Sequence, residues 1–156
     1  MKRIAVIAVL LVGLSGCGSL GPMQKMDGPI GTPVFDVIAL STINDGSDEI
    51  IFKEKARVYN KQDIKDDKYA SHFGIFIITQ KGVYALKWDV RSYQYNMLYS
   101  VSFSDIDTLL EANASIAAWI DSNVFVIKDK YGDEMGFHMQ GLSAAKSIIN
   151  KFKTKN

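Results

Sequence analysis

The most reactive side chain in this sequence is the thiol of Cys17, which belongs to the single cysteine of the chain. Cys17 ends the tetrapeptide Leu14-Ser15-Gly16-Cys17, which follows an apolar run from Ile4 to Leu14. Lys2 and Arg3 give the start of the chain a positive charge. A charged start, an apolar stretch and a small-residue end, in that order, are typical of a secretory signal peptide. We therefore expect residues 1–16 to direct export.

The apolar run is too short to cross a bilayer, which takes roughly 20 apolar residues. A buried helix with a structural cysteine is the alternative. Residues Leu14 to Cys17 resemble the lipobox of bacterial lipoproteins. The resemblance implies that the Cys17 thiol is lipidated, that the chain is cut just before it, and that its new amino group is acylated. Gly18 and Ser19 follow without an aspartate, which in this family implies the periplasmic face of the outer membrane.

Composition narrows the possible partners. Lys plus Arg number 18 and Asp plus Glu 17 in the whole chain. Without Lys2 and Arg3 the mature chain is close to neutral, so no basic field favours nucleic acid. A hydrophobic fraction of 47% indicates a folded globular part. With Cys17 lipidated, no disulfide can form, and the fold must rest on its core.

Residues 17–33 read as the lipidated cysteine followed by a flexible tether. Pro22, Pro29 and Pro33 are the three prolines of the protein, and four glycines accompany them without apolar periodicity. We expect no core residue here, so that a chain starting near Thr32 would still fold. Residues 34–156 then form a single domain, a size that can bury a real core.

The domain reads as mostly strands. Alternation of apolar and polar residues or short apolar runs bounded by turn residues indicate strands. The predicted strands are 50–59, 73–79, 83–90, 95–103, 117–120, 124–128 and 135–140. Residues 34–40 are ambiguous, 106–111 fit a strand or a short helical turn, and 121–123 read as a turn. Apolar residues at helical spacing from Leu142 to Phe152 predict one amphipathic C-terminal helix.

Three segments carry a resemblance to a known fold. They are Gly74 to Thr79 followed by Gly82-Val83-Tyr84, then Val101 to Ile106, and the terminal hairpin with its helix. Together they resemble the GRAM-type and bacterial branch of the pleckstrin-homology (PH) superfold, over about residues 49–152. The resemblance implies a curved antiparallel sheet, or partly open barrel, capped by the C-terminal helix. A lipocalin-like or other small β-barrel is the rival.

Two groups of residues are candidates for a binding surface. Lys53, Lys55 and Arg57 share one face of a predicted strand, about 6.6 Å apart. They could contact anionic lipid or an acidic partner, or form an ordinary solvated face that discourages aggregation. Tyr93 and Tyr95 flank a turn beside Arg91, and exposed aromatic residues near arginine suit a protein interface. A packed hairpin end is the alternative.

The motifs of catalysis are missing from the sequence. It has no nucleophile elbow, phosphate-binding glycine loop, paired metal-type histidines or spare thiol. The cluster around Asp45 reads as a turn, because the spacing of a calcium loop is not met. We expect no enzyme, metal or cofactor, but a membrane-anchored envelope lipoprotein whose domain binds another protein. A carrier or sensor of an apolar ligand inside a small barrel is the alternative.

Overall fold

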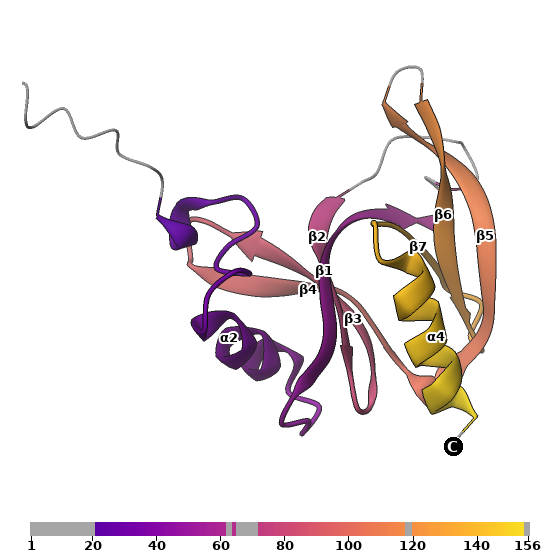
Figure 1. Ribbon diagram of the computed structural model, residues 1–156, viewed down its shortest axis with the longest axis horizontal. Helices are drawn as coiled ribbons and strands as arrows, with labels where there is room; N and C mark the ends of the chain where they lie inside the picture. Colours follow the sequence, from indigo (N-terminus) through magenta and orange to yellow (C-terminus); the bar gives the residue numbers. More distant parts are fainter. Residues whose placement is uncertain (1–20, 62–63, 65–71, 118–119, 155–156) are drawn as a thin grey trace, which may run out of the picture.

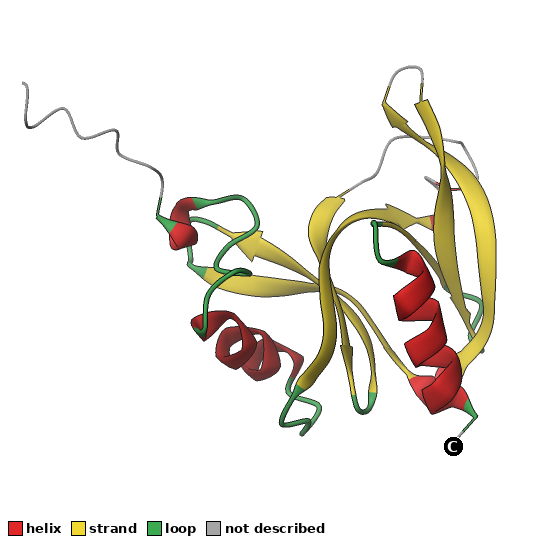
Figure 2. Cartoon of the chain, viewed as in Figure 1, coloured by secondary structure: helices red, strands yellow, loops and turns green. Residues whose placement is uncertain are grey.

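The protein is an open, curved antiparallel sheet of seven strands, with α-helices before the first strand and after the last strand of the chain (Figure 1; Figure 2). The computed structural model describes residues 21–61, 64, 72–117 and 120–154; the predicted signal peptide and Cys17 lie outside them. The strand order is β4-β3-β2-β1-β7-β6-β5, so the sheet is not closed into a barrel. The strands are β1 Ile50–Asn60, β2 His72–Thr79, β3 Gly82–Asp89, β4 Gln94–Ser102, β5 Ile106–Ala117, β6 Ile120–Asp129 and β7 Glu134–His138. The prediction of a mainly β fold is confirmed.

Strand β1 joins the two halves of the sheet. It pairs with β2 between Ile50 and Val58, but with β7 only over Arg57–Asn60. The rest of β1 therefore diverges from β7, and the sheet curves strongly around this strand (Figure 1). The predicted strand 50–59 is confirmed to within one residue.

The concave face holds the main core, which is filled by aromatic side chains. Helix α4, Leu142–Lys153, covers it with Ala145 and Ile149, both fully buried. Four phenylalanines of this core have at most 2% of their surface exposed: Phe76, Phe103, Phe125 and Phe137. The predicted C-terminal helix is confirmed, and basic residues in its last turn complement the helix dipole.

A second helix corrects the expectation of a single C-terminal one. Residues 34–40, which were ambiguous, belong to helix α2, Val34–Ile43, between Pro33 and a left-handed Asn44. Phe35, Ala39 and Ile43 are buried at a spacing of four residues. This spacing is helical, but the surrounding β-branched residues conceal it because they are equally common in strands. The helix packs on the face of the sheet opposite α4 (Figure 1).

The expectation that residues up to 33 carry no core contacts is also wrong over 21–33. After the 3-10 turn η1, Pro22–Gln24, the chain runs across β3 and β4. The Trp88 indole donates a hydrogen bond to the Met23 carbonyl (3.0 Å), and the Tyr95 hydroxyl donates one to the Asp27 carbonyl (2.9 Å). Gly28 is buried beside Trp88. The prolines and glycines shape a close-fitting cover rather than a free tether.

The long hairpin of β5 and β6 corrects a predicted turn. Residues 106–111 are the start of strand β5, after the 3-10 turn η2, Phe103–Asp105. Residues 121–123 lie within β6 and pair with 113–115 of β5. Polar residues are normal in a ladder that extends beyond the core, so their turn-like composition was misleading. The predicted strand 117–120 is wrong, because Ala117 ends β5 and pairs with Ile120, which begins β6; residues 118–119 lie outside the described residues.

A partly buried hydrogen-bond cluster joins the loop after α2 to the β2–β3 hairpin. The Asp45 carboxylate accepts hydrogen bonds from the Tyr84 hydroxyl (2.7 Å), the Thr79 hydroxyl (2.8 Å) and the Ser47 amide (2.7 Å). Burial raises the pKa of Asp45, but these hydrogen bonds outweigh burial and hold it below its usual value. Burial, with the Asp45 charge, raises the pKa of Tyr84.

We predict that Asp45→Asn lowers the free energy of unfolding at neutral pH by about 1–3 kcal/mol, because charged hydrogen bonds are lost. The lowered pKa of Asp45 means that its contribution is full above the unfolded-state value of 3.8 and disappears as pH falls through the folded-state pKa. Chemical denaturation from pH 7 down to pH 3 measures this dependence. An unchanged difference between variant and wild type across that range would contradict the role of the Asp45 charge.

We also predict that Gly28→Ala destabilises the fold while Gly31→Ala does not. Gly28 has φ of +65°, and a Cβ there would lie 2.5 Å from the Trp88 ring. A Cβ on Gly31 would meet nothing within 4 Å, which makes it a matched control. Thermal unfolding of both variants tests whether the segment is docked in solution. Equal melting temperatures would show that it is not.

Candidate binding surface

The alternation of β1 places Lys53, Lys55 and Arg57 together on the outer face of the sheet, opposite α4. Two of the three form ion pairs with the N-terminal segment, by which we mean residues 21–33 together with helix α2. Lys53 pairs with Asp36 of α2 at 2.5 Å and lies over the Phe35 ring. Lys55 pairs with Asp27 at 2.5 Å. The predicted basic stripe is therefore largely a surface seam of intramolecular ion pairs, and such exposed pairs contribute only about 0–1 kcal/mol each.

Arg57 lies beyond this seam, in a row across three strands. The register places it opposite Phe73 of β2 on one side and His138 of β7 on the other. Its guanidinium group lies over the Phe73 ring, 5.0 Å from the centroid. Phe73 is 57% exposed, although it begins the apolar run that predicted the strand 73–79. Phe73 is exposed because the N-terminal segment, which covers the neighbouring part of this face, does not reach this row of the sheet.

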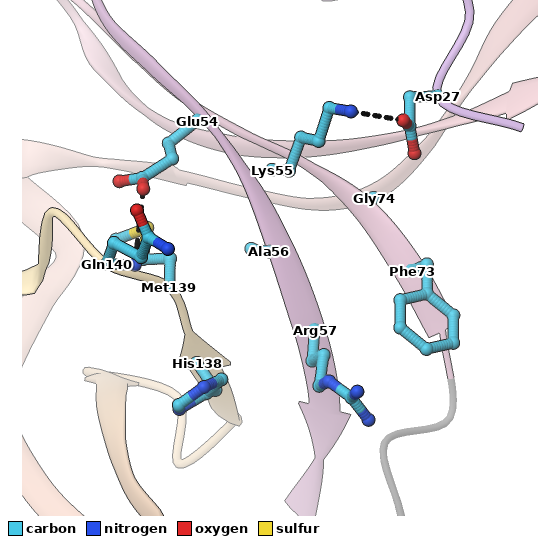
Figure 3. A pocket seen from close by; sticks show the side chains of 10 residues that line it. All are labelled: Asp27, Glu54, Lys55, Ala56, Arg57, Phe73, Gly74, His138, Met139 and Gln140. Carbon is cyan, nitrogen blue, oxygen red and sulfur yellow. Dashed lines mark hydrogen bonds and ion pairs between the residues drawn. The ribbon is translucent and has the colours of Figure 1, made fainter. Parts of the chain in front are cut away.

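The row borders an open cleft of about 410 Å³ beside β1, where this strand diverges from the end of β7, as shown in Figure 3. β1, β2 and the end of β7 contribute residues to it, and Asp27 borders it from the N-terminal segment. Figure 3 shows Arg57 and Phe73 side by side on one part of the rim and His138 on another. The cleft thus combines an exposed aromatic ring, a guanidinium group and an imidazole ring.

Glu54 forms another edge of the cleft. Its hydrogen bonds explain why an acidic residue stands on the apolar face of β1. Its carboxylate accepts hydrogen bonds from the Gln140 amide (3.2 Å) and the Gly141 amide (2.8 Å). These amides belong to the start of α4, where an acidic group suits the positive end of the helix dipole. Glu54 therefore fixes the end of β7 and the start of α4 relative to β1.

The two tyrosines proposed for a surface separate in the structure. Tyr93 is 49% exposed and occupies a left-handed position in the β3–β4 turn. Tyr95 is 4% exposed, which agrees with the alternative of a packed hairpin end and not with a role as an exposed binding residue. Its ring packs against Trp88 and Phe35 under the N-terminal segment. Burial raises the pKa of Tyr95, with a smaller contribution from the Asp27 charge.

Helix α2 carries a second exposed apolar area. Val34 and Val37 are 50% and 71% exposed, on the side of the helix away from the sheet. A helix that is apolar on most sides is usually buried. This surface was not predicted, because the helix itself was not. The spacing of four residues between Phe35, Ala39 and Ile43 could have predicted the helix. On such a helix Val37 lies on the side opposite these three residues.

Among the described residues, no cluster of three or more His, Cys, Asp or Glu side chains is placed to hold a metal ion. The His138 ring lies 3.5 Å from the Asn123 carbonyl oxygen. The cleft presents charged groups, hydrogen-bonding groups and an aromatic face.

Comparison with known proteins returned no match to a protein-family model, a curated protein or a solved structure. Within the part of the chain that the structure describes, no helix has the length and apolar character needed to cross a membrane.

Proposed function

We propose that this protein is a lipid-anchored envelope lipoprotein whose PH-like domain binds another protein without catalysing a reaction. Three features support the proposal: the lipobox-like sequence ending in Cys17, the curved antiparallel sheet capped by α4, and the cleft beside Phe73. The exposed stack of Phe73 and Arg57 carries the binding part of the argument.

Aromatic and arginine side chains dominate the energetics of protein interfaces, because both bury a large area and still make directed contacts. Leaving Phe73 57% exposed loses part of the free energy gained by burying it. Arg57 contacts the ring by a cation–π interaction, so the pair presents an aromatic and a charged group side by side. A partner segment with an apolar and an acidic side chain would complement this pair.

The filled concave side of the sheet favours a binding function at the surface over the transport of an apolar ligand inside the fold. The concave side is occupied by α4 and by the buried phenylalanines of the main core. The cleft beside Phe73 is open to solvent, and the charged side chains of Glu54, Lys55 and Arg57 border it. A carrier would need an enclosed apolar cavity of a few hundred Å³.

Site-specific photo-crosslinking in intact cells tests the proposal. A photoreactive phenylalanine analogue replaces Phe73, and matched variants carry it at Val37 and at Tyr131, which is 80% exposed on the β6–β7 turn. We expect one discrete protein adduct from position 73 and none from position 131. An adduct from position 37 alone would move the site to α2, and no adduct from positions 73 and 37 would contradict protein binding.

The anchoring part is tested in the same cells with Cys17→Ser. We expect this variant to accumulate as an unprocessed precursor, because the lipidated thiol is required before cleavage in the family that the lipobox resembles. The wild-type protein should fractionate with the outer membrane. Normal maturation of the variant, or a wild-type protein in the inner membrane, would contradict the corresponding part of the proposal.

A further inference from the structure

The point where the described chain begins is next to the end of the β3–β4 hairpin. Tyr93, in the turn of that hairpin, borders one cleft with residues 21–24. Met26 borders a neighbouring cleft of about 490 Å³ with Lys87, Val90 and Arg91. Figure 1 shows η1 beside the ends of β3 and β4, away from α4. We call Lys25, Met26, Lys87, Val90, Arg91 and Tyr93 the tip surface.

The tip surface combines exposed apolar and basic side chains. Met26 is 81% exposed, Val90 41% and Tyr93 49%. Lys25, Lys87 and Arg91 are also exposed, and no carboxylate of the described residues forms an ion pair with them. Asp89 is the acidic residue beside them, and its carboxylate accepts a hydrogen bond from the Arg91 amide.

The docked N-terminal segment determines which side of the domain is nearest to the lipid. Cys17 precedes Gly21 by four residues, and four residues span at most about 14 Å. The Met23 and Asp27 carbonyls are held by Trp88 and Tyr95, so the free length does not extend past η1. A lipid on Cys17 therefore brings the hairpin end, rather than α4, to the membrane.

We propose that the tip surface docks on an anionic bilayer surface and fixes the orientation of the domain on the membrane. This inference rests on the lipid anchoring proposed above. Tyrosine is enriched at membrane interfaces, where its ring and hydroxyl match the two environments. Basic residues near a bilayer are attracted to anionic headgroups. The tip surface supplies both kinds of group at the one place that the short connection holds near the lipid.

Phe73 borders both the cleft at the tip surface and the proposed protein-binding cleft, but the rest of the protein-binding cleft lies on a different part of the sheet. Arg57 and His138 lie where β1 meets β7, whereas Val90 and Tyr93 lie in the hairpin turn. A domain docked by its tip would therefore present β7, α4 and the Arg57 side of the cleft away from the bilayer. The anchor and the docking surface together would set the height and direction of that cleft.

Fluorescence of the lipidated full-length protein in vesicles tests the docking. Lipidation consumes the one native thiol, so Val90→Cys or Tyr131→Cys supplies a unique site for an environment-sensitive fluorophore. Mass spectrometry and vesicle flotation establish that each labelled protein carries its lipid. We expect the label at position 90 to emit at shorter wavelength in vesicles containing phosphatidylglycerol than in phosphatidylcholine alone, and the label at position 131 to be unaffected.

Charge reversal gives the second measurement. Combining Lys87→Glu with Arg91→Glu in the Val90→Cys protein should lower the ratio of docked to released domain by about 25-fold or more, roughly fivefold for each lost cation. Lys130→Glu with Lys151→Glu, an equal change at exposed sites elsewhere, should leave the emission as in the parent.

The outcomes separate the two proposals. If the protein carries no lipid and does not float with the vesicles, both the anchoring and the docking proposals are wrong. A lipidated, floating protein whose position 90 emits as in water overturns the docking alone. Equal shifts at positions 90 and 131, or equal effects of the two charge reversals, also overturn it, because they would show contact without a defined orientation.

Discussion

The structure depends on one constraint: strands β2 and β3 are apolar on both faces, so both faces must be covered. Phe76 and Ile78 point into the main core, while Ile75 and Ile77 point to the opposite side. Helix α4 can cover only the first of these faces. The second is covered by α2 and by residues 21–33, which the chain places before the first strand. The N-terminal segment is therefore part of the fold and not an appendage to it.

The same constraint explains the positions of the polar groups. Lys53 and Lys55 reach Asp36 and Asp27 because the cover lies directly over their strand. Asp45 connects the end of that cover to the β2–β3 hairpin through Thr79 and Tyr84. Where the cover ends, Phe73 and Arg57 are left at the surface. The Phe73 and Arg57 side of the candidate cleft is thus the part of the outer face that this cover does not reach.

The sequence predicted the sheet well, because strand signals are local. The alternation from Ile50, the apolar run ending at Thr79 and the helical spacing after Leu142 all depend on neighbouring residues. The N-terminal cover was missed because its contacts are distant: Met23 meets Trp88, and Asp27 meets Tyr95 and Lys55. Glycine and proline in residues 21–33 gave the composition of a linker, although Gly28 is there to fit against a ring. For the site, the sequence predicted the basic stripe on β1. It did not predict the ion-pair partners of the stripe or the exposure of Phe73, because both depend on where that same cover lies.

The most direct test of this account is the stability of the domain with and without its cover. Two chains, one starting at Gly18 and one at Thr32, differ by the segment that contacts Trp88 and Tyr95. Exposing these two rings and breaking two hydrogen bonds should lower the free energy of unfolding by roughly 2–5 kcal/mol. Chemical denaturation measures the difference. The account predicts a clearly lower midpoint for the shorter chain, and identical midpoints would contradict it.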